Sequence, residues 1–251
     1  MLNILNAPIQ PFLELTLNLL SEPINLNLFF SMWVIIVYVI SMFYGLMLVA
    51  SGFNFIISGH DVVKRENAKQ WLRNIVIMII LIQASFFIYQ LAIDLSSIIT
   101  SAVLTLVDPD FFLISVDDIG DIGLAIVFAL IYVLVLIVTA LILVIRYAFV
   151  AIGVVLLPLA IFFYFLPPLK SYGSLILNFL GIAIFITFFD VILLAGFSKL
   201  VDLAIFGGMQ ILVLISAFMI INVFMILLMF FSIVKAGLNV YTDVKKVVSV
   251  F

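Results

Sequence analysis

The chain of 251 residues is 68% hydrophobic and only 9% charged, whereas an average soluble domain is about half apolar and a quarter charged. A water-soluble fold would expose most of that apolar surface, so the composition excludes one and indicates a single integral membrane domain over residues 1–251. The chain has no Cys and a net charge of −3, which excludes a disulfide framework, thiolate chemistry and a basic nucleic-acid binder overall.

Residues 1–27 are predicted to form an amphipathic segment that lies in the membrane interface. Polar side chains recur on one helical face of residues 8–21, namely at Gln10, Glu14, Asn18 and Ser21. Pro23 should end this helix, because proline has no backbone N–H to donate.

Six apolar runs follow, and each approaches or exceeds the roughly 20 residues that a helix needs to cross a bilayer. They cover residues 28–50, 75–93, 122–145, 147–166, 174–197 and 209–234. The chain has no alternating strands of about ten residues, and in lipid only helices then satisfy the backbone. The sequence therefore predicts an all-α polytopic membrane protein with about six hydrophobic segments.

The distribution of charge predicts the orientation, because cytoplasmic loops are enriched in Lys and Arg. Residues 58–74 carry four of the ten bases, whereas the predicted helix extension and acidic loop over residues 94–121 carry six Asp and no base. We therefore expect the first segment in the cytoplasm, the second outside the cell, and the N-terminus outside.

Pro158 divides the run 147–166 into halves that are too short to cross alone. With six full crossings, six bases lie inside and four outside; if 147–166 is re-entrant, nine lie inside and one outside. The re-entrant path fits the charge rule better, although 20 apolar residues can cross despite one proline. The side on which the C-terminal tail 235–251 lies depends on this choice.

Gly45, Gly52 and Gly59 recur every seven residues and share one helical face. Small residues let helices approach closely in lipid. The pattern predicts helix packing, either within the chain or at a seam between subunits.

A polar stripe begins in the second apolar run with Gln83, Gln90 and Asp94, and continues at helical spacing through Ser97, Ser101, Thr105 and Asp108. A helix over residues 75–107 would be about 50 Å long and would project beyond the hydrocarbon core. The stripe is either a solvated face whose glutamines bond neighbouring helices, or the lining of an aqueous path.

Asp190 lies within a later apolar run, where an ionised carboxylate is costly without a partner. Arg146, at the junction of two apolar runs, is the nearest candidate partner, and Asn178 and Asn222 are further polar residues in these runs. An intramembrane ion pair between Arg146 and Asp190 is expected, with a proton or ion site as the alternative.

Lys64, Arg65, Lys69 and Arg73 are the four bases of residues 58–74, and the last three are spaced four apart. They therefore project from one helical face. This basic patch either anchors the first two spans at the cytoplasmic surface or docks an acidic partner or nucleic-acid phosphates.

No motif for a catalytic or cofactor site is present. The chain has no H-E-x-x-H, Walker A or glycine-rich dinucleotide sequence. Its single His, His60, lies in the basic loop, which gives no indication of a Ser–His nucleophile. We expect neither enzyme activity nor a bound cofactor or metal, so energetically uphill transport would need a separate ATPase.

Two stretches together suggest a family. Residues 46–85 combine a glycine-bearing span, a short turn before Asp61, a basic helix and a second span; residues 146–197 combine an Arg-Tyr start, a Leu-Pro-Leu-Ala break, a proline-closed turn and a long span. They resemble the TrbL-type polytopic channel subunit of type IV secretion and conjugation machines, and most of all its archaeal DNA-import branch, CedA. The resemblance covers about residues 40–200.

The resemblance implies a multi-pass subunit of an archaeal cell membrane. It also implies a cytoplasmic translocation ATPase, small membrane subunits, further copies of the chain and single-stranded DNA as partners. The leading hypothesis is therefore a channel or scaffold subunit for conjugation or DNA import. A secondary ion or small-solute transporter is one alternative, and a structural platform for a pilus or surface filament without a pore is another. The direction of transport, the transported strand and the oligomeric number stay open.

Overall fold

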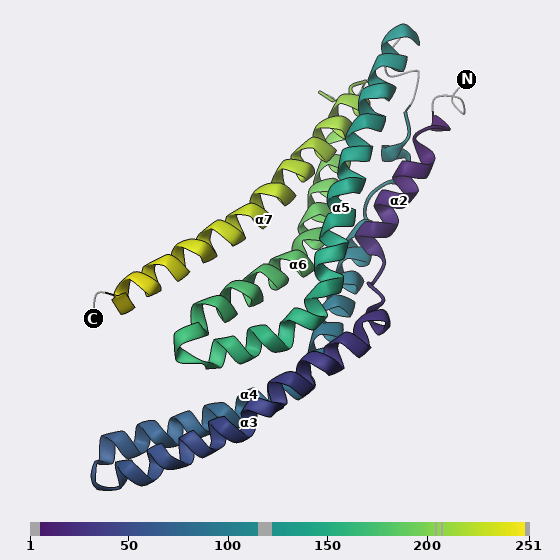
Figure 1. Cartoon of the computed structure of the whole chain (residues 1–251). Coiled ribbons are helices and arrows are strands. Elements are labelled where there is room, and N and C mark those ends of the chain that lie inside the picture. Colours follow the sequence, from purple (N-terminus) through teal and green to yellow (C-terminus); the bar gives the residue numbers. More distant parts are fainter. Residues whose placement is uncertain (1–5, 115–121, 204, 207, 249–251) are drawn as a thin grey trace. The chain divides into compact units, whose positions relative to one another are not determined.

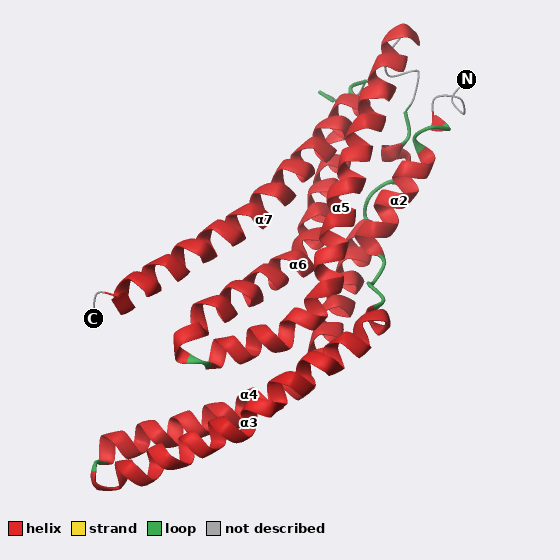
Figure 2. Cartoon of the chain, in the orientation of Figure 1, coloured by secondary structure: helices red, strands yellow, loops and turns green. Residues whose placement is uncertain are grey.

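The computed structural model describes residues 6–114, 122–203, 205–206 and 208–248, and every regular element within these ranges is helical (Figures 1 and 2). The α-helices are α2 (Gln10–Ser21), α3 (Phe30–Ile57), α4 (Val62–Leu104), α5 (Ile122–Phe165), α6 (Lys170–Val201) and α7 (Gln210–Val248). Single 3-10 turns form at Leu26–Phe29, Ser58–His60, Pro109–Phe112 and Pro167–Leu169. The expected all-α architecture is confirmed.

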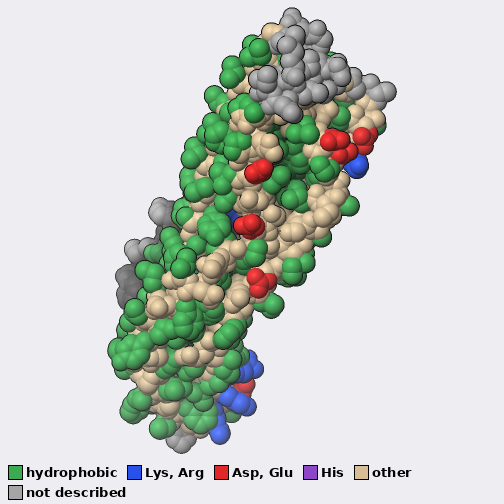
Figure 3. Space-filling model, turned by 90° about the vertical axis from the view of Figure 1, so that its right-hand side faces the viewer, with side chains coloured by type: hydrophobic (Ala, Val, Ile, Leu, Met, Phe, Trp, Pro, Cys, Tyr) green, Lys and Arg blue, Asp and Glu red, His purple; other side chains and the backbone are tan. Residues whose placement is uncertain are grey.

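Five helical segments of the described chain are long and apolar enough to cross a bilayer, which confirms a multi-pass membrane protein in contact with lipid. They are Leu26–Ile57, Val62–Leu104, Gly123–Phe165, Pro167–Val201 and Gln210–Ser232. Hydrophobic side chains cover most of the face seen in Figure 3, and residues such as Leu46 and Ile56 are about 70% exposed. In water such a surface would aggregate, whereas in lipid it is expected.

The sequence divided residues 122–166 into two apolar runs, but the structure has one helix, α5, which passes through Pro158. Residues 147–166 are therefore not a separate re-entrant segment. Proline removes one backbone bond, whereas ending a helix leaves four N–H or four C=O groups without partners. In lipid the second cost is larger, so the helix continues to the turn Pro167–Leu169 that leads into α6.

The chain forms two compact units. Unit 1 comprises residues 1–24, 92–149 and 182–230, and unit 2 comprises residues 25–91, 150–181 and 231–251. Helices α4, α5, α6 and α7 each contribute one part to each unit.

The core of unit 1 is apolar and closely packed. Tyr132, Leu136 and Phe218 are fully buried there, and the Tyr132 and Phe218 rings lie 6.0 Å apart. The N-terminal helix α2 buries Leu13 and Leu20 in the same core. The amphipathic segment predicted for the interface is therefore packed through its apolar side against the rest of unit 1.

In unit 2, α3 pairs with the first part of α4 through the turn Ser58–His60. The Trp33 indole Nε1 donates a hydrogen bond to Ser85 Oγ at 2.8 Å, and the Trp33 ring lies 5.5 Å from that of Phe86. These contacts tie α3 to α4 and leave the opposite side of α3 exposed.

Two predicted end segments take helical form only in part. Helix α4 ends at Leu104 and is followed by the 3-10 turn Pro109–Phe112, while Asp117, Asp118 and Asp121 of the acidic loop lie outside the described residues. The C-terminal tail 235–251 continues α7 as far as Val248.

Candidate functional site

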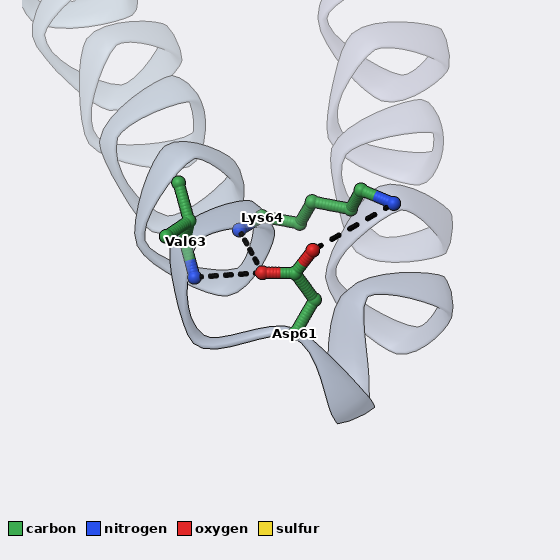
Figure 4. A network of polar contacts seen from close by, with 3 residues as sticks. All are labelled: Asp61, Val63 and Lys64. Atoms are coloured by element: carbon green, nitrogen blue, oxygen red, sulfur yellow. Dashed lines mark hydrogen bonds and ion pairs between the residues drawn. The ribbon is translucent and has the colours of Figure 1, made fainter.

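The basic patch begins at the first turn of α4. The Asp61 carboxylate oxygen Oδ1 accepts hydrogen bonds from the backbone N–H groups of Val63 at 2.9 Å and Lys64 at 3.2 Å, and Oδ2 lies 3.7 Å from Lys64 Nζ (Figure 4). This is the arrangement of an N-terminal cap. It starts the helix at Val62, so the four bases lie on one continuous helix with the following span.

The remaining bases of the patch are exposed. The Arg65 guanidinium lies 5.6 Å from the centre of the Phe55 ring of α3, while Lys69 and Arg73 line an open hollow of about 470 Å³ on α4. The other residues that line this hollow are Glu66, Gln70, Leu72, Val76 and Ile77. The hollow therefore combines two positive charges and the one carboxylate of Glu66 with an apolar floor, at the end of a membrane-spanning segment.

The predicted polar lining divides into two parts. Gln83 and Gln90 are exposed and Asp94 is half-buried, and the Gln83 side chain lies near the Tyr44 hydroxyl of α3. Further along α4, Ser97 and Ser101 both direct their hydroxyls to the Ser21 carbonyl at the end of α2. Ser97 and Ser101 thus serve packing within unit 1, whereas Gln83 and Gln90 before them and Thr105 and Asp108 beyond them are exposed.

The predicted glycine stripe borders open space, with Gly45 and Gly52 on α3 and Gly59 in the following turn Ser58–His60. A Cβ atom added at Gly45, Gly52 or Gly59 would meet no atom within 4 Å. The close helix contacts are made instead at Gly153, beside the Tyr89 ring, and at Gly173, against the backbone of α5. The seven-residue spacing therefore does not mark packing within the chain, and a seam between subunits stays a prediction.

Arg146 and Asp190 are both buried in unit 1, with 6% and 0% exposure. Arg146 donates from Nε to the Ala183 carbonyl at 2.8 Å and from Nη2 to the Ile184 carbonyl at 3.0 Å. Ser96 Oγ donates to the same Ile184 carbonyl at 2.8 Å.

The two predicted partners do not form a direct ion pair. Neither carboxylate oxygen of Asp190 has a hydrogen-bond partner in the described chain, although Arg146 is close enough to act on this charge through space. Asp190 lies about two turns beyond the carbonyls that hold Arg146, which is roughly 10 Å along α6. The guanidinium is therefore satisfied mainly by backbone carbonyls.

A cavity of about 10 Å³ lies beside Arg146 within unit 1, which is room for about one water molecule. Its polar lining consists of Glu22, Ser96, Ser97, Arg146 and Thr187. Ser96 was not singled out from the sequence, because one serine in an apolar helix is unremarkable until its partner on another helix is known.

No family model, curated protein or solved structure matches this chain. Among the described residues, no group of three or more His, Cys, Asp or Glu could hold a metal ion.

Proposed function

We propose that the chain is a membrane channel or scaffold subunit of a type IV secretion-like machine that translocates DNA across an archaeal cell membrane. The observation that carries this proposal is the basic patch on α4, where Lys69 and Arg73 line an exposed hollow on a surface that is otherwise largely apolar. Positive charge of this kind suits an acidic protein surface or a phosphate backbone. The resemblance over residues 40–200 to the TrbL-type subunit is the reason for proposing a type IV secretion-like machine in particular.

The number of candidate spans supports the orientation. Five crossings place the two chain ends on opposite sides of the membrane. With the turn Ser58–His60 in the cytoplasm, eight of the ten bases lie on the inner side, Arg146 lies within the membrane and Lys199 lies outside. This orientation agrees with the positive-inside rule, and in it the basic patch would face the cytoplasm, where we propose that a translocation ATPase docks.

Two further surfaces support an oligomeric assembly. The surface at Gly45 and Gly52 of α3 and at Gly59 of the following turn is open and suits close approach by a second copy or a small membrane subunit. Gln83 and Gln90 are exposed at membrane depth, where an amide needs water or a polar partner. Together with Asp94 they would line a path for single-stranded DNA between subunits.

The test moves the positive charge without removing it. Arg65, Lys69 and Arg73 are replaced by Gln, while Lys is introduced at the exposed positions Val63, Asn67 and Asn74, which lie on other faces of α4. Gln70 is not used because it lines the same hollow. Since the charge near the membrane is kept, the variant should insert normally.

We expect this variant to lose the ATPase in co-purification and to lose DNA transfer. A control variant carries the three added Lys and keeps the original patch, and it should retain both. If the relocated variant also retains both, the patch only anchors the spans and the docking proposal is wrong.

One observation favours a second candidate function, that of a secondary ion transporter. Asp190 is a buried carboxylate without a hydrogen bond at membrane depth, and such residues often mark ion or proton pathways.

A further inference from the structure

Three helices of unit 1 bury polar oxygen atoms that have no hydrogen-bond partner in the described chain. They are Oγ1 of Thr100 on α4, both carboxylate oxygens of Asp190 on α6, and Oδ1 of Asn222 on α7. Thr100 and Asp190 are fully buried and Asn222 is 7% exposed. In a membrane interior, polar atoms in this state are costly unless something else satisfies them.

Thr100 differs from two other buried threonines of unit 1, Thr16 on α2 and Thr139 on α5. Thr16 and Thr139 each donate to the carbonyl four residues earlier, at 2.7 and 2.9 Å, which is the usual way for a threonine in an apolar helix to satisfy its hydroxyl. The Thr100 hydroxyl forms no such bond. This hydroxyl is therefore not held by its own helix and can turn its oxygen toward another group.

The register of the helices brings these oxygens to one level. Helices α6 and α7 are antiparallel (Figure 1), and the Phe189 and Phe224 rings lie 6.5 Å apart, so Asn222 is level with the residue after Asp190. Helix α4 runs parallel to α6, and Ser96 Oγ of α4 donates to the Ile184 carbonyl of α6. Because a helical carbonyl points toward the C-terminal end, Ser96 lies level with the turn of α6 that follows Ile184. One turn further along α4 comes Thr100, and the following turn of α6 carries Asp190.

The ionisable side chains around this level carry a net negative charge. Arg146, which lines the cavity together with Glu22, acts on Asp190 through space, but it is outnumbered by the carboxylates of Glu22, Asp94 and Asp190. Oxygen ligands with a carboxylate suit a hard cation. A single buried carboxylate balances one positive charge, whereas a divalent ion would leave an uncompensated charge in an apolar core.

We propose that Asp190, Asn222 and Thr100 form a binding site for one monovalent alkali cation inside unit 1. The water-sized cavity offers an approach to it, because Ser96 and Thr187 line that cavity and lie one turn before Thr100 and Asp190 respectively. The site is independent of DNA translocation, so either proposal can fail without the other.

The experiment measures thermal unfolding of the full chain in detergent micelles by circular dichroism. NaCl and KCl are each titrated against choline chloride at constant ionic strength. The melting temperature should rise saturably with Na⁺ or K⁺, because a ligand that binds only the folded state stabilises it by mass action. Choline, which is too large for the site, should give no such rise.

Variants assign the effect to the site. Asp190→Asn should abolish the cation-dependent shift, and Thr100→Val should raise the half-saturating concentration about tenfold, the equivalent of about 1.4 kcal/mol. The matched control is Asp202→Asn, which changes an exposed acid just beyond the end of α6, and it should keep the wild-type response. Thr100→Val removes a hydroxyl without a partner, so it should fold even if Asp190→Asn does not.

Equal melting temperatures in NaCl, KCl and choline chloride would overturn the proposal. So would a stabilisation by acid alone with no response to either cation, because a proton would then occupy Asp190. A cation response that survives both Asp190→Asn and Thr100→Val would likewise refute this site.

Discussion

The tight hairpin between α5 and α6 makes a sharp stability prediction at Gly173. A Cβ atom at this position would fall on the backbone nitrogen of Tyr164 and within 2.6 Å of the Ala160 carbonyl oxygen. Non-bonded carbon contacts normally begin at about 3.5 Å. The obstructing atoms are backbone atoms, and the turn Pro167–Leu169 closes the hairpin a few residues away, so neither helix can move aside freely.

The expected cost of Gly173→Ala follows from these contacts. Overpacking costs about 1–3 kcal/mol, and a backbone clash belongs at the upper end. Alanine returns about 1 kcal/mol through its higher helix propensity. We therefore expect a net loss of about 2 kcal/mol in the free energy of unfolding.

The assay is unfolding in mixed micelles with increasing denaturing detergent, followed by circular dichroism. The matched control is Gly45→Ala, where the added methyl group meets no atom within 4 Å and the propensity term alone should raise the stability of the isolated chain by up to about 1 kcal/mol. Equal stability of the two variants would refute the close approach of α5 and α6.

Three other predictions follow from the same structure. The chain has no native Cys, so single cysteines introduced at Gly59 and Asp110 can be probed with an impermeant thiol reagent on intact cells. The cysteine at position 59 should be protected and the one at position 110 should be labelled. The reverse pattern would invert the proposed orientation. Arg146→Met should cost about 2 kcal/mol in the free energy of unfolding, because two interhelical hydrogen bonds at about 1 kcal/mol each are lost, and an unchanged denaturation midpoint would contradict this. Replacing Gln83 and Gln90 together with Leu should weaken oligomer assembly or DNA transfer, measured by native gel and by mating assay, whereas wild-type behaviour in both would remove the case for a polar lining.

The membrane spans are well predicted from the sequence, because the hydropathy of a segment depends only on its own residues. The helix expected over residues 75–107 is found as the latter part of α4, which ends at Leu104, and its basic start lies on the same helix. The apolar runs on either side of Arg146 were separated for the same local reason. Arg146 can lie buried within one continuous helix because the carbonyls of Ala183 and Ile184 on α6 accept its guanidinium. That contact is between helices, so local composition does not reveal it.

The candidate sites were less predictable, since a pattern shows which residues share a face but not what covers that face. Gly45, Gly52 and Gly59 have the regular spacing yet contact nothing in the chain, whereas Gly153 and Gly173 have no regular spacing and make the close contacts. Thr100 gave no signal in the sequence. Only the register of α4 against α6 brings it to the level of Asp190.

The most direct test of the central claim is DNA transfer between cells in a strain from which this chain has been deleted. We expect transfer to be lost in this strain and to be restored by the wild-type chain in trans. The variant with the relocated basic patch should insert into the membrane without restoring transfer. Undiminished DNA transfer in the deletion strain would contradict the claim that this chain is a subunit of a DNA-translocating machine.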